Sequence, residues 1–229
     1  RGRSRFHLRA VGEHGDGIGN LVDYRQIVGD EDIGKFQLAL QLVEQGRVDL
    51  DATVASIVPE FGELQVLDGF EGGEPVLRAP KTQATVRQLM NHTAGCGYHF
   101  LNEKLFKYCT DYGFPHVLSG IKQSISAPLV HDPGTVWEYG VSTDWVGQVV
   151  EAVSGQTLAD YLAENVYGPL GMTDSTFAPS DEQRERLLPV LSRQPDGSLV
   201  ATELDLEVER EWDAGGHGSY GTIADYGCF

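Results

Sequence analysis

Residues 133–177 read PGTVWEYGVSTDWVGQVVEAVSGQTLADYLAENVYGPLGMTDSTF, and this stretch decides the fold. The letters STD at 142–144 can cap a helix, and the apolar run that follows them stops at Gly155. A second cap of the capping-box type, TLAD, stands at 157–160. The stretch therefore predicts two helices joined by a glycine turn, at 143–154 and 158–166.

Short signals on either side of this stretch predict a mainly helical chain with few strands. Upstream, TVRQ at 85–88 is a capping box for a short helix. The polar residues 68–84 are rich in Gly and Pro, which predicts a surface loop or a hairpin. Downstream, SDEQ at 180–183 begins another helix, and SLVAT at 198–202 is the best strand signal.

Residues 30–46, DEDIGKFQLALQLVEQG, predict a further helix over 33–45. Apolar residues surround most of it, so we expect it to be the most buried of the predicted helices. Asp32 and Lys35 lie three residues apart at its start, on one face. Two interpretations stay open. Either Asp32 caps the helix while Lys35 extends past apolar neighbours, or Lys35 is a catalytic group and position 32 is that of its nucleophile.

The composition excludes several classes of function. Asp and Glu outnumber Lys and Arg by 34 to 17, a formal charge of −17, so we expect no binding of nucleic acid. The sequence has no run of 18 apolar residues, so no membrane-spanning helix is expected. The N-terminus RGRSRFHLRA is basic, lacks the apolar centre of a signal peptide and does not begin with Met. We therefore expect a cytoplasmic protein whose chain is processed, tagged or incomplete.

Other patterns that could carry chemistry are weaker. Neither the three cysteines nor the histidines have the spacing of a metal site, so no metal and no cofactor is expected. The letters SGIK at 119–122 match S-x-x-K, but they lie between two prolines and outside any predicted apolar helix. GHGSYG at 216–221 matches a nucleotide-binding pattern without a strand before it or a helix after it, which indicates a glycine-rich turn.

Several segments together resemble the serine hydrolases that comprise class C β-lactamases, D-alanyl-D-alanine peptidases and related esterases and transesterases. Residues 133–177 are similar to the family's loop P-G-x-x-x-x-Y, its helix ending in E-x-x-[ST]-G and its segment P-L-G-M. LMNHTAG at 89–95 resembles the family's L-L-x-H-T-S-G, and residues 40–61 resemble the stretch after its nucleophile helix. The resemblance extends over residues 35–226.

This resemblance implies an α+β fold of the β-lactamase/transpeptidase type. The chain is expected to hold mainly the helical part of that fold, with an incomplete antiparallel sheet. It is also expected to divide into a divergent N-terminal segment, 1–31, and a partial hydrolase domain, 32–229, that lacks the C-terminal strands.

The resemblance also implies a site. Lys35 falls on the family's lysine and Tyr139 on its tyrosine, while Asp32 takes the place of the nucleophilic serine. Val141, at the third position of the family's Y-x-N, is closer to the esterase branch. In this family the lysine and tyrosine activate the serine, which attacks an ester or amide carbonyl and forms an acyl-enzyme.

Two functional hypotheses follow. The first is an esterase-like serine hydrolase that acts on a small-molecule ester or amide. The second is a non-catalytic relative that binds a small ligand or a partner chain, because Asp32 offers no hydroxyl and its charge would hold Lys35 protonated.

Overall fold

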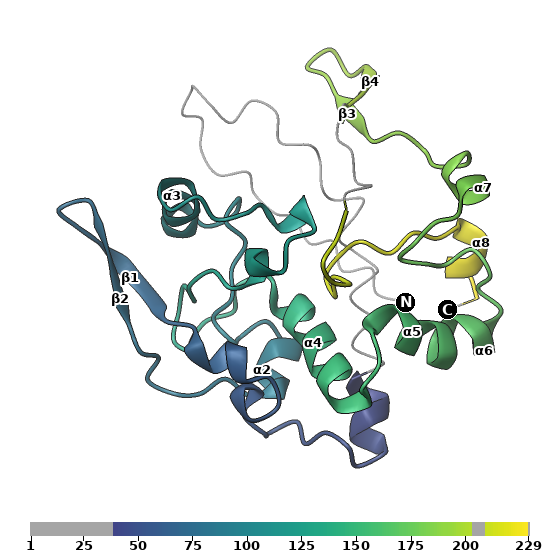
Figure 1. Cartoon of the computed structure of the whole chain (residues 1–229). Helices are drawn as coiled ribbons and strands as arrows, with labels where there is room; N and C mark the ends of the chain where they lie inside the picture. The colour runs from purple at the N-terminus through teal and green to yellow at the C-terminus, as the bar shows by residue number, and fades with distance from the viewer. Residues whose placement is uncertain (1–38, 203–208, 229) are drawn as a thin grey trace, which may run out of the picture.

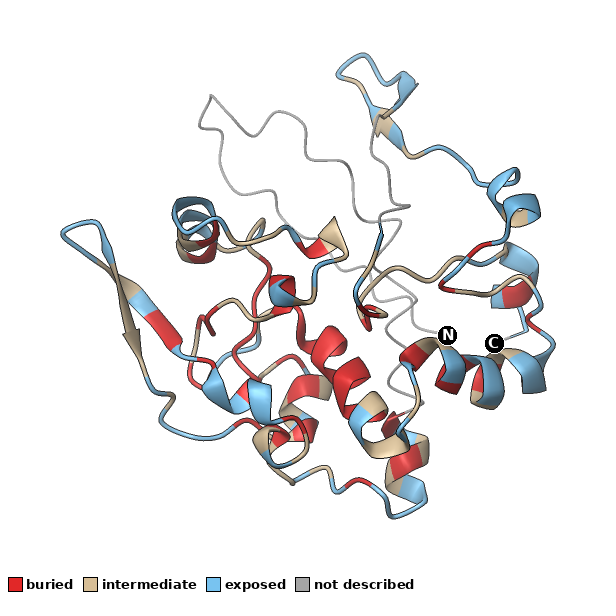
Figure 2. Ribbon diagram, viewed as in Figure 1, coloured by how far each residue is buried: buried red, intermediate tan, exposed pale blue. Residues whose placement is uncertain are grey.

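The computed structural model describes residues 39–202 and 209–228. Its central element is helix α4, Ser142–Ser154, around which the other described elements are arranged (Figure 1). The nine residues of 142–150 are all buried, and the helix is the largest buried region in Figure 2. It ends at Gly155, whose φ of 75° allows its N–H to donate to Glu151 O at 2.9 Å.

The start of α4 corrects one prediction. Ser142, Thr143 and Asp144 do not cap the helix but form its first turn, and Val141 at the N-cap makes no side-chain hydrogen bond. The reason is that these side chains make tertiary contacts instead. All three are buried, and the Asp144 carboxylate accepts a hydrogen bond from the Gly216 N–H at 2.7 Å, although Gly216 is distant in sequence. Contacts with another segment therefore replace local capping.

The second predicted helix, 158–166, is confirmed as a continuous helical segment of three parts. These are α5 (Leu158–Leu162), the π-helical turn η6 (Ala163–Tyr167) and α6 (Gly168–Leu170). Thr157 Oγ1 accepts from Asp160 N at 3.1 Å, which is the expected cap. The segment ends at Gly171 with a φ of 69°.

The helix predicted at 33–45 is described only from residue 39, and residues 39–44 are helical. Ala39 and Leu42 are buried, whereas Leu40 is 40% exposed. In its described part this helix is therefore less buried than α4, contrary to the prediction, because it borders the core on one face only. After it, Arg47 Nη2 donates to Val153 O at 2.7 Å and so connects it to the end of α4.

Residues 68–84, predicted as a loop or hairpin, contain a hairpin. Strand β1 (Val66–Glu71) pairs antiparallel with β2 (Glu74–Arg78) through a turn at Gly72 and Gly73. A second small antiparallel pair joins β3 (Leu191–Arg193), which was not predicted, and β4 (Leu199–Ala201), the strand that SLVAT predicted. The described chain is thus mainly helical with two small sheets.

Two short helices begin as the sequence predicted. Thr85 and Gln88 form a capping box for α2, Val86–Met90, and Ser180 and Gln183 form another for α7, Asp181–Arg184. The remaining elements are η2 (Val54–Ser56), η3 (Pro59–Glu63), α3 (Glu103–Asp111), η4 (Val117–Ser119), η5 (Lys122–Ile125) and α8 (Ile223–Tyr226).

One hydrophobic core surrounds α4 and receives side chains from most of these elements. Its largest fully buried members include Trp145, Phe177, Leu42, Leu89, Ile125, Leu129 and Leu158. Among the described residues, no helix combines the length and apolar character that crossing a membrane requires.

Candidate active site

Tyr139 lies on the loop that leads into α4, and this loop is fixed against residues 92–97. Gly134 N donates to Thr93 O at 2.7 Å and Glu138 N donates to His92 O at 2.9 Å. The two segments approach so closely that a Cβ added at Gly140 would lie 2.5 Å from Gly97 Cα. Backbone contacts on both sides of Tyr139 therefore set its position.

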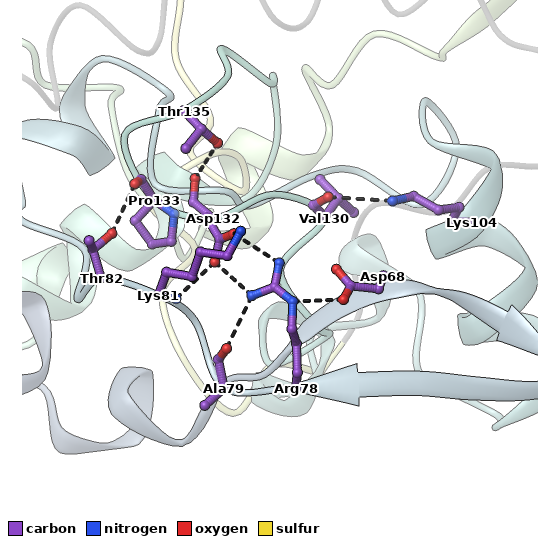
Figure 3. Close-up of polar contacts among 10 residues, drawn as sticks. All are labelled: Asp68, Arg78, Ala79, Lys81, Thr82, Lys104, Val130, Asp132, Pro133 and Thr135. Carbon is purple, nitrogen blue, oxygen red and sulfur yellow. Dashed lines mark hydrogen bonds and ion pairs between the residues drawn. The ribbon is translucent and has the colours of Figure 1, made fainter.

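Asp132 anchors the start of the same loop (Figure 3). Both of its carboxylate oxygens accept from the Arg78 guanidinium at 2.8 Å, and Lys81 N donates to Oδ1 at 2.8 Å. Arg78 Nε also donates to Asp68 at 2.7 Å. The Arg78 guanidinium holds the pKa of the Asp132 carboxyl well below its usual range. A bidentate pair therefore ties the Tyr139 loop to the end of the β1–β2 hairpin.

Tyr139 belongs to a group of aromatic rings. Its ring centroid lies 4.9 Å from that of His92, 5.4 Å from that of Tyr98 and 6.4 Å from that of Trp137. His92 is buried and has a φ of 57°; no other non-glycine residue in the described part of the chain has a positive φ. A side-chain-bearing residue in this region is strained, and such strain concentrates at functional sites.

A second polar centre lies under the turn of residues 214–218. The Asp144 side chain is fully buried, and its Oδ1 is 3.7 Å from Nδ1 of the partly buried His217. Gly216 permits this arrangement, since an added Cβ would lie 2.8 Å from the Asp144 carboxylate and 3.1 Å from the Tyr98 hydroxyl. Burial raises the pKa of the nearby Cys96 thiol to about 12, so Cys96 is not a thiolate nucleophile at neutral pH.

Of the three site residues that the resemblance implied, the structure describes Tyr139. Asp32 and Lys35 lie outside the described residues, so the approach of Lys35 to Tyr139 stays a prediction. The structure adds Asp132, which pairs with a residue 54 positions away, and His92, whose backbone conformation no sequence pattern marks.

The S-x-x-K pair at 119–122 does not lie on one helical turn. Ser119 ends η4 and Lys122 begins η5, and Gly120 between them has a φ of 75°. Ser119 Oγ instead accepts from Ile121 N at 3.3 Å. No group of His, Cys, Asp and Glu within residues 39–202 and 209–228 is arranged to hold a metal ion.

The chain belongs to the Beta-lactamase family, whose sequence profile matches residues 37–229. Its β-lactamase/transpeptidase-like fold is thereby confirmed. The profile match begins just after Lys35, so positions 32 and 35 precede it.

Three proteins to which the chain is similar act as esterases or acyl-group transferases or are named for statin synthesis. A lovastatin esterase of Penicillium rubens is 34% identical over 197 residues, which are 82% of this chain and 49% of the relative. A monacolin J acid methylbutanoyltransferase of Aspergillus terreus is 41% identical over 145 residues, 61% of this chain and 34% of the relative. The structure of a simvastatin synthase from Aspergillus terreus has a TM-score of 0.81 at 32% identity, covering 88% of this chain and 50% of the other. The chain thus spans between a third and a half of the length of these proteins.

A pair of histidines near the site predicts a pH dependence of stability. The rings of His99 and His116 lie 4.6 Å apart, and burial together with His116 lowers the pKa of His99 to about 4. The pKa of His116 is also lowered, by burial and by His217. Both pKa values are thus lower in the folded chain than the value near 6.5 of an unfolded histidine, so the unfolded state binds more protons as the pH falls below 6.5. The melting temperature should fall as the pH decreases from about 6.5 to about 4.

Thermal unfolding followed by circular dichroism across this pH range measures the effect. The double variant His99→Gln, His116→Asn should flatten the slope, and Asn at 116 keeps an N-cap acceptor for Leu118 N. An unchanged slope in the variant would assign the effect to other groups.

Proposed function

We propose that Tyr139 is the proton-transferring residue of an acyl-transfer site for small carboxylic esters. The observation that carries this proposal is the placement of Tyr139 on a loop fixed from both sides, within a chain that belongs to the Beta-lactamase family. The names of the relatives support ester chemistry, since one is an esterase and another transfers a methylbutanoyl group. In this proposal Tyr139 and Lys35 are placed to move the proton of a serine hydroxyl at position 32, where this chain has Asp32 instead.

We also propose that Asp32 makes the unmodified chain a poor catalyst. A carboxylate that attacked an ester would form an anhydride rather than an ester intermediate. Its charge would also stabilise the protonated form of Lys35, which then cannot act as a base. This residue favours the second candidate function, a non-catalytic relative that binds an ester-like ligand without turning it over.

A covalent probe tests the proposal. We expect the unmodified chain to show little or no hydrolysis of p-nitrophenyl acetate and no labelling by a fluorophosphonate at position 32. Asp32→Ser should restore labelling, and adding either Lys35→Ala or Tyr139→Phe should lower the labelling rate by about 10²–10⁴-fold, the usual contribution of a general base.

Two outcomes would contradict this assignment. Labelling of the unmodified chain at Ser119 or Ser219 would place the nucleophile elsewhere. Equal labelling of Asp32→Ser with and without Tyr139→Phe would remove Tyr139 from the site. Circular dichroism and dye binding on each variant show whether a silent variant is folded.

A further inference from the structure

Trp137 is an exposed aromatic residue beside the candidate active site. Of the three tryptophans, Trp145 and Trp212 are 1% and 8% exposed, whereas Trp137 is 63% exposed. Its neighbour Val136 is 41% exposed as well. What distinguishes Trp137 from other exposed apolar residues is its contact with the ring of Tyr139, and an indole left in water can gain the free energy of burial by covering a ligand's apolar part.

The position of Trp137 is set by the same contacts that fix Tyr139. The two rings are nearly parallel, with an interplanar angle of 20° and a centroid distance of 6.4 Å. The strained, buried His92 contacts both rings, with its centroid 6.2 Å from that of Trp137. The next residue, Glu138, accepts from Asn102 Nδ2 at 3.0 Å. The indole is therefore held at a fixed place relative to the Tyr139 ring rather than free on a mobile loop.

The net charge of the chain favours a neutral ligand. The chain carries a formal charge of −17, and the carboxylate nearest in sequence to Trp137, that of Glu138, already has Asn102 and His131 as partners. A carboxylic acid in its ionised form would meet an acidic protein and an uncharged aromatic surface. A neutral ester of the same chain length would meet only the favourable apolar contact.

We propose that Trp137 is a specificity-determining residue that binds the apolar acyl chain of a neutral ester and aligns its carbonyl with Tyr139. The ligand class is an ester with an unbranched or branched acyl chain of several carbons, in preference to an acetyl ester or the free acid. This inference rests on the proposed function, since it takes Tyr139 as the reacting residue.

Tryptophan fluorescence tests the proposal without any turnover. The exposed Trp137 should dominate solvent-dependent changes in emission, because the other two tryptophans lie in the core. Titration with methyl hexanoate should shift the emission to shorter wavelength and saturate, whereas equal concentrations of methyl acetate or hexanoate should not. If one face of the acyl chain is covered, each of the four additional methylenes contributes about twofold, so the hexanoyl ester should bind about 16-fold more tightly than the acetyl ester.

Variants test whether Trp137 itself binds the ester or only lies near the binding site. In saturation-transfer NMR with methyl hexanoate, Trp137→Ala should reduce binding at least tenfold, roughly the loss of the acyl-chain contact. Trp137→Phe should keep most of the binding, and the matched control Phe106→Ala, another exposed aromatic on α3, should have no effect. Near-ultraviolet circular dichroism of the two buried tryptophans shows that each variant is folded.

Equal binding by Trp137→Ala and Trp137→Phe would overturn the proposal, as would unchanged Trp137 emission when NMR detects bound ester. The proposed function can fail independently. If Asp32→Ser stays unlabelled while methyl hexanoate still shifts the emission of Trp137, the chain binds esters without reacting with them.

Discussion

Gly95→Ala is expected to destabilise the chain by about 2–5 kcal/mol and to displace the loop that carries Tyr139. Gly95 has a φ of 89°, which disfavours any residue with a Cβ. An added Cβ would also lie 2.2 Å from His131 O, far inside van der Waals contact. The backbone cannot easily move away, because Gly95 O accepts from Val130 N at 2.8 Å and Thr93 O accepts from Gly134 N at 2.7 Å.

Gly155→Ala is the matched control for this prediction. Gly155 also has a positive φ, 75°, but an added Cβ there would have no neighbour within 4 Å. Its substitution should cost only the backbone term, about 1–2 kcal/mol. Urea unfolding of both variants measures the difference, and near-ultraviolet circular dichroism reports the aromatic rings around Tyr139. If both variants lost the same stability, the close approach of the added Cβ at position 95 to His131 O would not contribute to the loss.

The sequence predicted those elements that depend on residues close together in the chain. The capping boxes of α2 and α7 each involve two residues three positions apart, so the sequence pattern alone is enough to predict where these helices begin. The end of α4 at Gly155 is equally local, because it depends on one residue that adopts a positive φ.

Predictions were wrong where tertiary contacts override local preference. The oxygens at 142–144 looked like helix caps, but Asp144 bonds to Gly216, which lies 72 residues away. The ion pair between Asp132 and Arg78 could not be predicted for the same reason, because the two residues are 54 positions apart and no local pattern connects them. Tyr139 was recognised through the family resemblance alone, as a tyrosine before a helix has no distinctive pattern.

Trp145→Ala is expected to be the most damaging substitution in the core, with a loss of about 3–5 kcal/mol. Trp145 lies near the start of α4 and is 1% exposed, and its ring packs edge-on against Phe61 with centroids 5.1 Å apart. Its Nε1 also donates to Ile125 O at 3.1 Å. Truncation would leave a cavity beside α4 and a buried carbonyl without its donor.

Two further variants divide this loss into its parts. Trp145→Phe keeps most of the apolar volume but removes the donor to Ile125 O, so it should cost about 1–3 kcal/mol, the penalty of an unsatisfied buried acceptor. Trp137→Ala removes the same side chain from an exposed position and should change stability by less than about 0.5 kcal/mol. Urea midpoints should therefore decrease in the order Trp137→Ala, Trp145→Phe, Trp145→Ala. A loss for Trp145→Ala as small as that for Trp137→Ala would mean that α4 is not the centre of the core.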